Sequence, residues 1–321
     1  MSVAGATDLN PTALPIAGTG LGTVLDELAA LREPLLYASV PGNAGDSAIN
    51  CAAYRVFEAR GLRVERVERV EPNVNAERTL GRVLVGTGGG NLVPMYDDMH
   101  RLIERHHAGC RRLILLPATI RGHQALLGTL GGNVTVLCRD QPSLAHVQRH
   151  APRVQALASH DVALHLDVRA LLAETRWQFL PQVSSPAQAR RNLRRRWRGW
   201  KYERNNTSRP DELFAFRTDV ERAERAGAAS AVANIDVSVE FVSDDMSPRL
   251  ALEATWRLLG FLDRYRSVHT DRLHVAILSA LLGKRVLLHD NSYGKNSAVY
   301  DQSMRWHFPK VELCSRAGGP S

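Results

Sequence analysis

The chain has 321 residues, enough for two domains of about 150 residues each. Hydrophobic residues make up 44% of it and charged residues 23%, an ordinary globular composition that excludes wholesale disorder, collagen and a coiled-coil rod. The longest apolar stretches, such as residues 275–282, are far shorter than the roughly 20 residues that span a bilayer, so we expect no membrane-spanning helix.

The termini and the cysteines indicate the compartment. The opening residues MSVAGATDLNPT have neither the basic nor the apolar region of a secretory signal, so we expect a cytoplasmic protein. The four cysteines lie far apart and form no CxxC pair, which predicts reduced thiols and argues against a zinc ribbon or a redox pair. No HExxH, Walker A or GxSxG motif occurs, so the sequence indicates no metal, no cofactor and no serine-hydrolase elbow.

The net charge of +8 is concentrated in one segment. Residues 187–204 hold eight arginines and lysines and a single carboxylate, Glu203, so the rest of the chain is almost neutral. This uneven distribution means that the high overall charge describes one surface and not the whole molecule.

The first half of the chain alternates apolar runs with helical patterns, which is typical of parallel sheets with helical crossovers. We predict helices over residues 21–31, 47–60, 95–107 and 143–150. We predict strands over residues 34–40, 62–67, 82–85, 112–116, 134–138 and 162–166. Pro117 is expected to end the fourth of these strands, because proline cannot donate to a sheet ladder.

The second half follows the same pattern after a basic linker. We predict strands over residues 212–216, 267–269 and 285–289 and helices over residues 249–264, 271–282 and 297–306. The sequence therefore predicts an α/β protein with two doubly wound, Rossmann-like domains. We place the N-terminal domain at residues 1–180, a basic linker or helix at 181–210 and the C-terminal domain at 211–321.

Ligands bind at the carboxyl ends of strands in open parallel sheets, and several polar clusters fall there. The first cluster runs from Gly42 to Asp46 and opens a helix, whose free N–H groups suit an anion; a tight turn with Asp46 as the N-cap is the alternative. The second is Gly88-Gly89-Gly90-Asn91, in which three consecutive glycines are hard to explain by structure alone.

Two further clusters carry cations. Arg139 follows an apolar strand, where its guanidinium could fork onto a phosphate or carboxylate, or pair internally with Asp140. The segment Thr270 to His274 opens an apolar helix with Asp271 as the expected N-cap, so Arg272 and His274 would form an anion site with an acid/base group. A buried structural histidine is the alternative for His274. Lys295, in a glycine-bearing loop, is another candidate anion ligand.

Taken together, these segments resemble the polysaccharide pyruvyl transferases. The resemblance extends from about Leu35 to Tyr300 and is greatest for the exopolysaccharide ketal-forming members. Its landmarks are GNAGD at 42–46, GGGN at 88–91, RDQPS at 139–143, FRTDVE at 216–221, VHTDRLHVAILSALLGKRV at 268–286 and DNSYGKNSAVY at 290–300. The sequence departs from the family pattern at Pro41, at residues 116–119 and after GGGN, which affects the expected acceptor contacts more than the donor site.

The resemblance implies a GT-B type architecture and a transfer of pyruvyl from phosphoenolpyruvate. The acceptor would be a sugar of an exopolysaccharide repeat carried on a lipid at the cytoplasmic membrane face, and the product a cyclic pyruvate ketal. Carried onto this chain, the family's Arg-Leu-His donor site falls on Arg272, Leu273 and His274, and the arginine of its Arg-Asp segment matches Arg139.

We assign roles on this basis. Arg272 and Arg139 would clamp the phosphate and carboxylate of the donor, with Lys295 as a weaker candidate. His274 is the candidate general acid and Asp46 the candidate base. The acceptor-binding residues are expected to be Gly42, Asn43, Gly45, Gly89, Gly90 and Asn91.

The basic segment Arg190–Arg204 has three interpretations. One helical stripe holds Arg190, Arg194, Trp197 and Lys201, with further arginines beside it and Trp200 interleaved. This pattern is compatible with a solvated linker helix, with peripheral docking on an anionic membrane, or with nucleic-acid binding. No recognition motif supports nucleic acid, so we expect none to bind. For the whole chain, the alternatives to pyruvyl transfer are a GT-B glycosyltransferase that uses a nucleotide sugar and a nucleic-acid-binding protein built around the arginine-rich segment.

Overall fold

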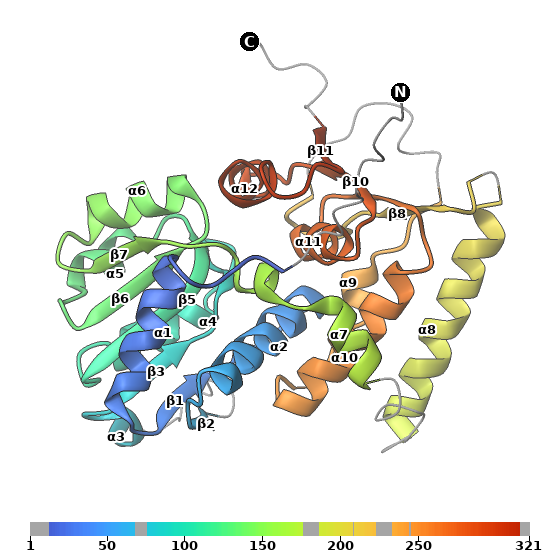
Figure 1. Ribbon diagram of the computed structural model, residues 1–321. Helices are drawn as coiled ribbons and strands as arrows, with labels where there is room; N and C mark the ends of the chain where they lie inside the picture. The colour runs from blue at the N-terminus through green and yellow to red at the C-terminus, as the bar shows by residue number, and fades with distance from the viewer. Residues whose placement is uncertain are drawn as a thin grey trace, which may run out of the picture.

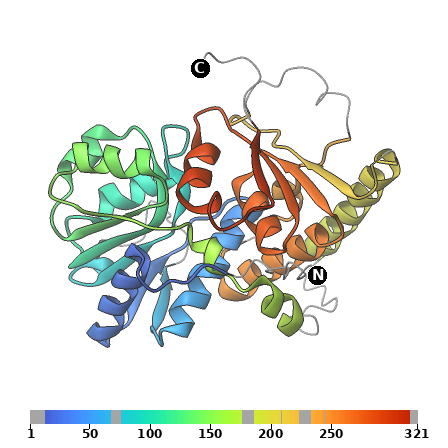
Figure 2. The same ribbon diagram turned by 45° about the horizontal axis from the view of Figure 1, so that its top comes forward.

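A computed structural model describes residues 13–67, 76–175, 186–207, 209–222, 233–243 and 245–314. Two separate parallel β-sheets organise these residues, a larger one from the first half of the chain and a smaller one from the second half (Figures 1 and 2). The N-terminal lead-in up to residue 12, the last five residues of the predicted N-terminal domain and residues 181–185 of the predicted linker lie outside the described residues.

The larger sheet has seven strands in the order β2-β1-β3-β5-β6-β7, with β4 paired to β5, and every pairing in it is parallel. The strands are β1 (Leu35–Ala38), β2 (Val64–Val67), β3 (Val83–Gly86), β4 (Gly89–Leu92), β5 (Arg112–Ile120), β6 (Val134–Cys138) and β7 (Gln155–Ala158). Because both of its faces are covered by helices, the central strands are apolar on consecutive residues. In β1, Leu35 and Tyr37 face one core and Leu36 and Ala38 face another.

Six helices accompany this sheet: α1 (Gly20–Leu31), α2 (Ala44–Ala59), α3 (Ala76–Thr79), α4 (Asp98–His106), α5 (Gln124–Thr129) and α6 (Gln141–His150). The side chains of α1 and α2 share the core of Leu35 and Tyr37, whereas Met99 and Leu102 of α4 join the core on the opposite face. The sheet is thus doubly wound, as the alternation of apolar strands and amphipathic helices predicts.

The smaller sheet has the order β11-β10-β9-β8 and is also entirely parallel. Its strands are β8 (Glu212–Ala215), β9 (Ser267–Thr270), β10 (Arg285–His289) and β11 (Val311–Cys314). The helices of this half are α9 (Val237–Glu240), α10 (Pro248–Leu262), α11 (Leu273–Leu281) and α12 (Lys295–Val299), and a π-helical turn follows at Tyr300–Met304.

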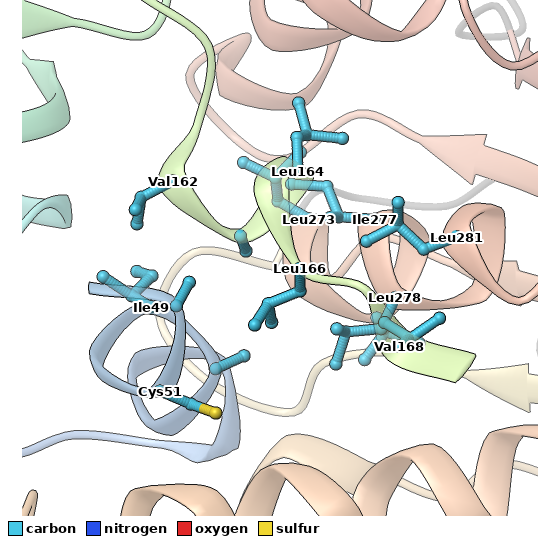
Figure 3. Close-up of a cluster of buried hydrophobic side chains, with 14 of the residues drawn as sticks. Ile49, Cys51, Val162, Leu164, Leu166, Val168, Leu273, Ile277, Leu278 and Leu281 are labelled. Atoms are coloured by element: carbon cyan, nitrogen blue, oxygen red, sulfur yellow. The ribbon is translucent and has the colours of Figure 1, made fainter. Parts of the chain in front are cut away.

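The connection between the sheets contributes to a common core. It contains a 3₁₀ turn, η1 (Val162–His165), and helices α7 (Val168–Thr175) and α8 (Pro186–Asn205). Figure 3 shows Leu164 and Leu166 of this connection lying between Ile49 of α2 and Ile277 of α11. Burial of these side chains removes apolar surface from water and so fixes α2 and α11 next to each other.

Several sequence predictions are corrected by the structure. Residues 162–166 form η1 and not a strand; the last strand of the larger sheet is β7, which the sequence analysis missed. Strand β5 continues past Pro117 to Ile120, because its pairing with β6 shifts register between Leu115 and Ala118, so the missing N–H of proline falls at an irregularity. The glycine segment forms the short strand β4 in part, and β11 and α5 were not predicted.

The N-terminal residues of two helices also differ from the prediction. Asn43, and not Asp46, is the N-cap of α2, and Asp46 completes a capping box at the third helical position. Arg272, and not Asp271, is the N-cap of α11, because the Asp271 carboxylate accepts the backbone N–H of Arg217 instead.

The other predicted strands and helices are present with small shifts at their ends, and the α/β class with parallel, Rossmann-like sheets is confirmed. The domain limits at residues 180 and 210 and the GT-B arrangement stay predictions. All four cysteines are free thiols, and no helix in the described parts of the chain is long and apolar enough to cross a bilayer.

Candidate functional site

A cavity of about 280 Å³ lies where the carboxyl ends of strands from both sheets meet. Ten of the twelve site residues predicted from sequence line it: Gly42, Asn43, Asp46, Gly90, Asn91, Arg139, Arg272, Leu273, His274 and Lys295. The remaining lining residues are Pro41, Tyr96, Asp98, Arg217, Glu221 and Ser238. The two predicted residues outside the lining, Gly45 and Gly89, lie directly behind it, against His274 and Ile49 respectively.

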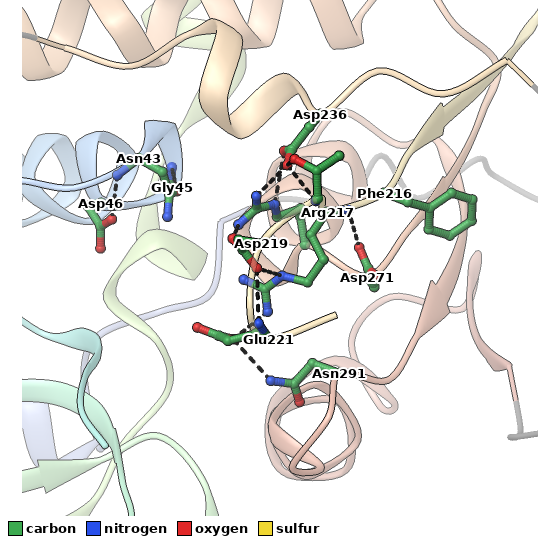
Figure 4. A network of polar contacts seen from close by, with 12 residues as sticks. Asn43, Gly45, Asp46, Phe216, Arg217, Asp219, Glu221, Asp236, Asp271 and Asn291 are labelled. Atoms are coloured by element: carbon green, nitrogen blue, oxygen red, sulfur yellow. Dashed lines mark hydrogen bonds and ion pairs between the residues drawn. The ribbon is translucent and has the colours of Figure 1, made fainter. Parts of the chain in front are cut away.

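Asp46 enters the cavity from the first turn of α2. Its Oδ2 accepts the backbone N–H of Asn43 at 2.8 Å, and the Asn43 side chain in turn accepts the N–H of Gly45 at 2.7 Å (Figure 4). Gly42 permits this turn, because a Cβ there would lie only 2.0 Å from Asp46 Oδ2. Burial raises the pKa of Asp46 above its usual range, against the opposing charge of His274. A carboxylate with a raised pKa is a stronger base.

His274 enters from the first turn of α11, on the opposite side of the same cavity. Its Nε2 lies 3.3 Å from Asp161 Oδ2 and 3.4 Å from Arg139 Nη1. An ionised carboxylate can only accept, so Nε2–H donates to Asp161 and Nδ1 is the ring nitrogen left to exchange a proton. The first turns of α2 and α11 therefore place the Asp46 carboxylate and the His274 imidazole in the same cavity.

Asp161 and Arg139 form a buried ion pair beneath His274. Arg139 Nη1 lies 2.6 Å from Asp161 Oδ2, both side chains are about 1% exposed, and Arg139 Nε also donates to Thr119. Burial alone would raise the pKa of Asp161, but the charges of His274 and Arg139 hold it well below its usual range. The alternative Arg139–Asp140 pair is wrong: Asp140 caps α6 and pairs with Arg121.

Arg272 is held by two carboxylates. Its Nε and Nη2 donate to Asp236 at 3.0 and 2.5 Å, and its Nη1 lies 2.7 Å from Asp219 Oδ2. Burial opposes the charge of Arg272, but its pKa is nevertheless raised by Asp236 and Asp219. In this structure the guanidinium fork is directed mainly at protein carboxylates.

Glu221 connects the remaining cations. Its carboxylate binds Lys295 Nζ at 2.7 Å, Arg217, and Asn291 Nδ2 at 3.1 Å, and it accepts the hydroxyl of Tyr96 at 2.9 Å. Because Tyr96 belongs to the first half of the chain, this last bond crosses the cavity between the two halves. Burial lowers the pKa of Lys295 to about 8, although Glu221 favours its charged form. Lys295 and Arg217 hold the pKa of Glu221 well below its usual range against the effect of burial.

The charges of the lining favour a small anion with room for acid/base chemistry. Four cations line the cavity, Arg139, Arg217, Arg272 and Lys295, against three carboxyl groups, one of which has a raised pKa. Two of these cations lie next to Gly90: a Cβ there would lie 3.5 Å from Arg139 Nη2 and 3.7 Å from Lys295 Nζ. Among the described residues, no three histidine, cysteine or acidic side chains are grouped so as to hold a metal ion.

Comparison with known proteins assigns the chain to a family. A model of the polysaccharide pyruvyl transferase family matches residues 43–293, which include every residue of the predicted site except Gly42 and Lys295. The chain belongs to this family. The transferase is also 25% identical, over 92% of its length and 93% of the relative's, to a protein of Bacillus subtilis (strain 168) named "Putative pyruvyl transferase EpsO".

The fold has a counterpart among solved structures. The crystal structure of an uncharacterized protein from Klebsiella pneumoniae subsp. pneumoniae NTUH-K2044 matches with a TM-score of 0.68 and 28% sequence identity. The match covers 93% of the transferase and 99% of that chain.

The sequence analysis missed several residues of the transferase's cavity. Arg217 and Glu221 lie in the FRTDVE run that carried the resemblance, yet the sequence analysis gave them no role. Both residues come just after strand β8, and polar residues after a predicted strand are the signal by which the other clusters were found. Asp161 follows β7, a strand that was itself missed. Tyr96, Asp98 and Ser238 carry no such signal.

Replacing Gly45 by alanine is expected to reduce the activity of the transferase with little loss of stability. The new Cβ would lie 2.6 Å from His274 Nδ1 and 2.9 Å from Asn43 Oδ1, so the imidazole has to move from its position. Alanine suits a helical position, which limits the loss of stability. Turnover and urea unfolding measure the two effects; Gly260→Ala, where a Cβ meets nothing within 4 Å, is the matched control. Equal turnover in both variants would contradict this placement of His274.

Proposed function

We propose that this transferase moves the pyruvyl group of phosphoenolpyruvate to a sugar of an exopolysaccharide repeat unit and closes it into a cyclic ketal. The observation that carries the proposal is the convergence of one imidazole, one carboxyl with a raised pKa and four cations on a single cavity. We further propose a lipid-linked oligosaccharide as acceptor and a place for the reaction on the cytoplasmic side of the membrane, in line with the resemblance.

The cations beside Gly90 form the proposed donor site, so Gly90 is proposed here on the donor side and not among the acceptor contacts expected from the sequence. Phosphoenolpyruvate carries a phosphate and a carboxylate within a few atoms, and both suit guanidinium and ammonium donors. Arg139 Nη2 and Lys295 Nζ both lie within 4 Å of the point that a Cβ at Gly90 would occupy, so the glycine leaves space beside the two cations. Arg272 would complete the clamp through Nη1, whose partner Asp219 is 35% exposed and so can be exchanged for a ligand more readily than the buried Asp236.

The proposed acceptor contacts lie on the other side of the cavity. Gly42, Asn43 and Asn91 offer backbone and amide groups suited to sugar hydroxyls, and Asp46 follows them on α2. Gly45 would act indirectly by letting His274 approach closely, and Gly89 by leaving room for Ile49 of α2.

In the proposed reaction, His274 and Asp46 donate and accept the protons. His274 protonates C3 of the donor, which makes C2 electrophilic, and a sugar hydroxyl adds to C2 while its proton passes to Asp46. The C2–O bond to phosphate then breaks, and a second hydroxyl closes the ring and returns a proton to His274. The proton on Asp46 leaves with the phosphate, so one donor and one diol give one ketal and one phosphate.

Phosphoenolpyruvate is expected to raise the unfolding temperature of the protein. A ligand that binds only the native state stabilises it by RT ln(1 + [L]/Kd), about 2.7 kcal/mol at a hundredfold excess over Kd. Thermal unfolding with phosphoenolpyruvate, with inorganic phosphate and with a panel of nucleotide sugars measures this effect. A shift with a nucleotide sugar alone would favour the glycosyltransferase alternative and contradict the donor assignment.

The same binding is expected to weaken above a pH of about 8. Burial lowers the pKa of Lys295 to about 8, so its ammonium is present below this pH and is lost above it. The donor loses one cationic partner as the pH rises, and its Kd increases. Lys295→Arg is the matched variant, because a guanidinium stays charged throughout and should remove this dependence. An identical alkaline loss of affinity in that variant would exclude Lys295 from the donor site.

A further inference from the structure

Helix α8 has an exposed face on which apolar and cationic side chains alternate. Leu193 is 70% exposed, and Trp197 and Trp200 are each 54% exposed, which is unusual for side chains of this size. Four exposed cations accompany them: Arg190, Arg194, Lys201 and Arg204. We call these seven residues the α8 face.

The α8 face is a continuous stripe. With 3.6 residues per turn, its seven members fall within about a third of the helix circumference, on the side opposite the buried Tyr202. Figures 1 and 2 show α8, in yellow, at an outer edge of the molecule. The side chains of the stripe are exposed to solvent, although Trp197 and Lys201 also line a cavity beside α9.

The opposite side of α8 holds the helix firmly in place. The Tyr202 hydroxyl accepts the backbone N–H of Phe214 and donates to the carbonyl of Glu212, both in β8. Arg198 pairs with Glu240 of α9, and Glu203 pairs with Arg264 after α10. Glu203 is the one acidic residue of α8, so the cations of the α8 face have no carboxylate of their own helix left to neutralise them.

Each tryptophan of the α8 face has a cationic side chain over its indole ring. Lys201 Nζ lies 5.3 Å from the centroid of the Trp197 ring, and the Arg204 guanidinium carbon lies 5.3 Å from that of Trp200. At a bilayer surface, indole rings sit at the level of the headgroups while basic side chains reach lipid phosphates. A purely solvated helix gains nothing from exposing one leucine and two tryptophans on a single stripe.

We propose that the α8 face docks the transferase on an anionic lipid surface. The cations supply electrostatic attraction to the lipid phosphates, and Leu193, Trp197 and Trp200 insert into the boundary between headgroups and acyl chains. Nucleic acid would use the cations but leaves Leu193 without a partner, and the rest of the chain is almost neutral, so lipid is the better match. This inference does not depend on the identity of the donor or of the acceptor.

Sedimentation with vesicles tests the charge contribution. The full-length protein is expected to bind vesicles of phosphatidylcholine mixed with phosphatidylglycerol, to bind pure phosphatidylcholine far more weakly, and to dissociate as salt is added. A basic residue near an anionic surface contributes roughly a fivefold gain in partitioning. The combined variant R190Q, R194Q, K201Q and R204Q should therefore lower the partition coefficient by roughly several hundredfold. Its unfolding temperature should not change, since these side chains are exposed.

A tryptophan variant tests insertion. Trp197→Ser combined with Trp200→Ser should lower partitioning by at least about tenfold, because a buried aromatic ring contributes more than one decade in transfer. Brominated acyl chains should quench tryptophan fluorescence in the unaltered protein and much less in this variant. Trp306→Ser is the matched control, since Trp306 is 75% exposed and also has an arginine, Arg305, over its ring, but lies outside α8.

Three results would overturn the proposal. One is absence of binding to the anionic vesicles. Another is vesicle binding that is the same in the two α8 variants as in the unaltered protein, or that falls as much in Trp306→Ser as in the α8 tryptophan variant. The third is tight, salt-sensitive binding of a DNA or RNA duplex with none to vesicles, which would assign the α8 face to nucleic acid instead.

Discussion

His274→Ala is expected to lower kcat by at least about 100-fold while the protein stays folded. A positioned general acid typically contributes 10²–10⁴-fold, and this imidazole is held in the cavity by Asp161 and against Gly45. The side chain is 13% exposed and lines a cavity that already exists, so its removal leaves little unfilled core. Phosphate release from phosphoenolpyruvate in the presence of acceptor measures the loss.

Two comparisons make this result specific. His307→Ala removes an exposed histidine outside the cavity and should keep normal turnover. Asp46→Asn retains the oxygen that accepts the N–H of Asn43 but removes the base, and should lose activity to a similar extent. Because burial raises the pKa of Asp46, the acid limb of the rate profile should lie at higher pH than for an ordinary aspartate. Near-normal turnover in His274→Ala would remove this residue from the proposed chemistry.

Asp161→Asn is expected to destabilise the protein by about 3–5 kcal/mol, the usual result of leaving one member of a buried ion pair without its partner. Arg139, which is about 1% exposed, would keep its charge with only the Thr119 hydroxyl and a neutral amide to accept from it. Urea unfolding measures the loss. The difference in stability between the variant and the unaltered protein should shrink in acid. The pKa of Asp161 is lowered in the folded state, so the ionised carboxylate stabilises the fold at any pH above the pKa of an unfolded aspartate, about 3.9. This stabilisation is lost as the pH falls below that value.

A surface pair is the control for this variant. Arg285 and Glu312 form an ion pair whose side chains are 59% and 56% exposed, so Glu312→Gln should cost no more than about 1 kcal/mol. The double variant Arg139→Met with Asp161→Leu should recover most of the stability, because apolar replacements leave no unpaired charge, yet it should remain inactive. A loss below about 1 kcal/mol in Asp161→Asn would mean that Arg139 finds another partner.

The sequence predicted the parts of the site that follow apolar strands. Strand β6 is apolar and buried along its whole length, and β10 has an apolar centre, Val286 to Leu288, before a turn segment. The ends of both strands, and hence Arg139 and Lys295, could therefore be located from the sequence. The edge strand β7 is half-exposed and has no apolar run, and for this reason Asp161 was not foreseen as the partner of Arg139.

Pairing between distant residues could not be predicted in the same way. The sequence places Arg272 and Asp236 in different segments, and only the tertiary fold brings the carboxylate at the start of α9 to the guanidinium at the start of α11. Likewise, Tyr96 and Glu221 meet because the two sheets face one another, a relation that local patterns do not encode. The residue types were therefore predictable, whereas their partners and their protonation were not.

The shared core beneath the cavity has a consequence for how a bulky acceptor could enter. Asp46 and His274 begin two helices, α2 and α11, whose apolar faces are packed together through Leu164 and Leu166 (Figure 3). The proposed acid and base are thus mounted on one block, whereas the Tyr96 hydroxyl and the Glu221 carboxylate join the two halves of the chain at the same cavity. Because that hydrogen bond belongs to neither α2 nor α11, breaking it to admit a large acceptor would leave the spacing of Asp46 and His274 unchanged.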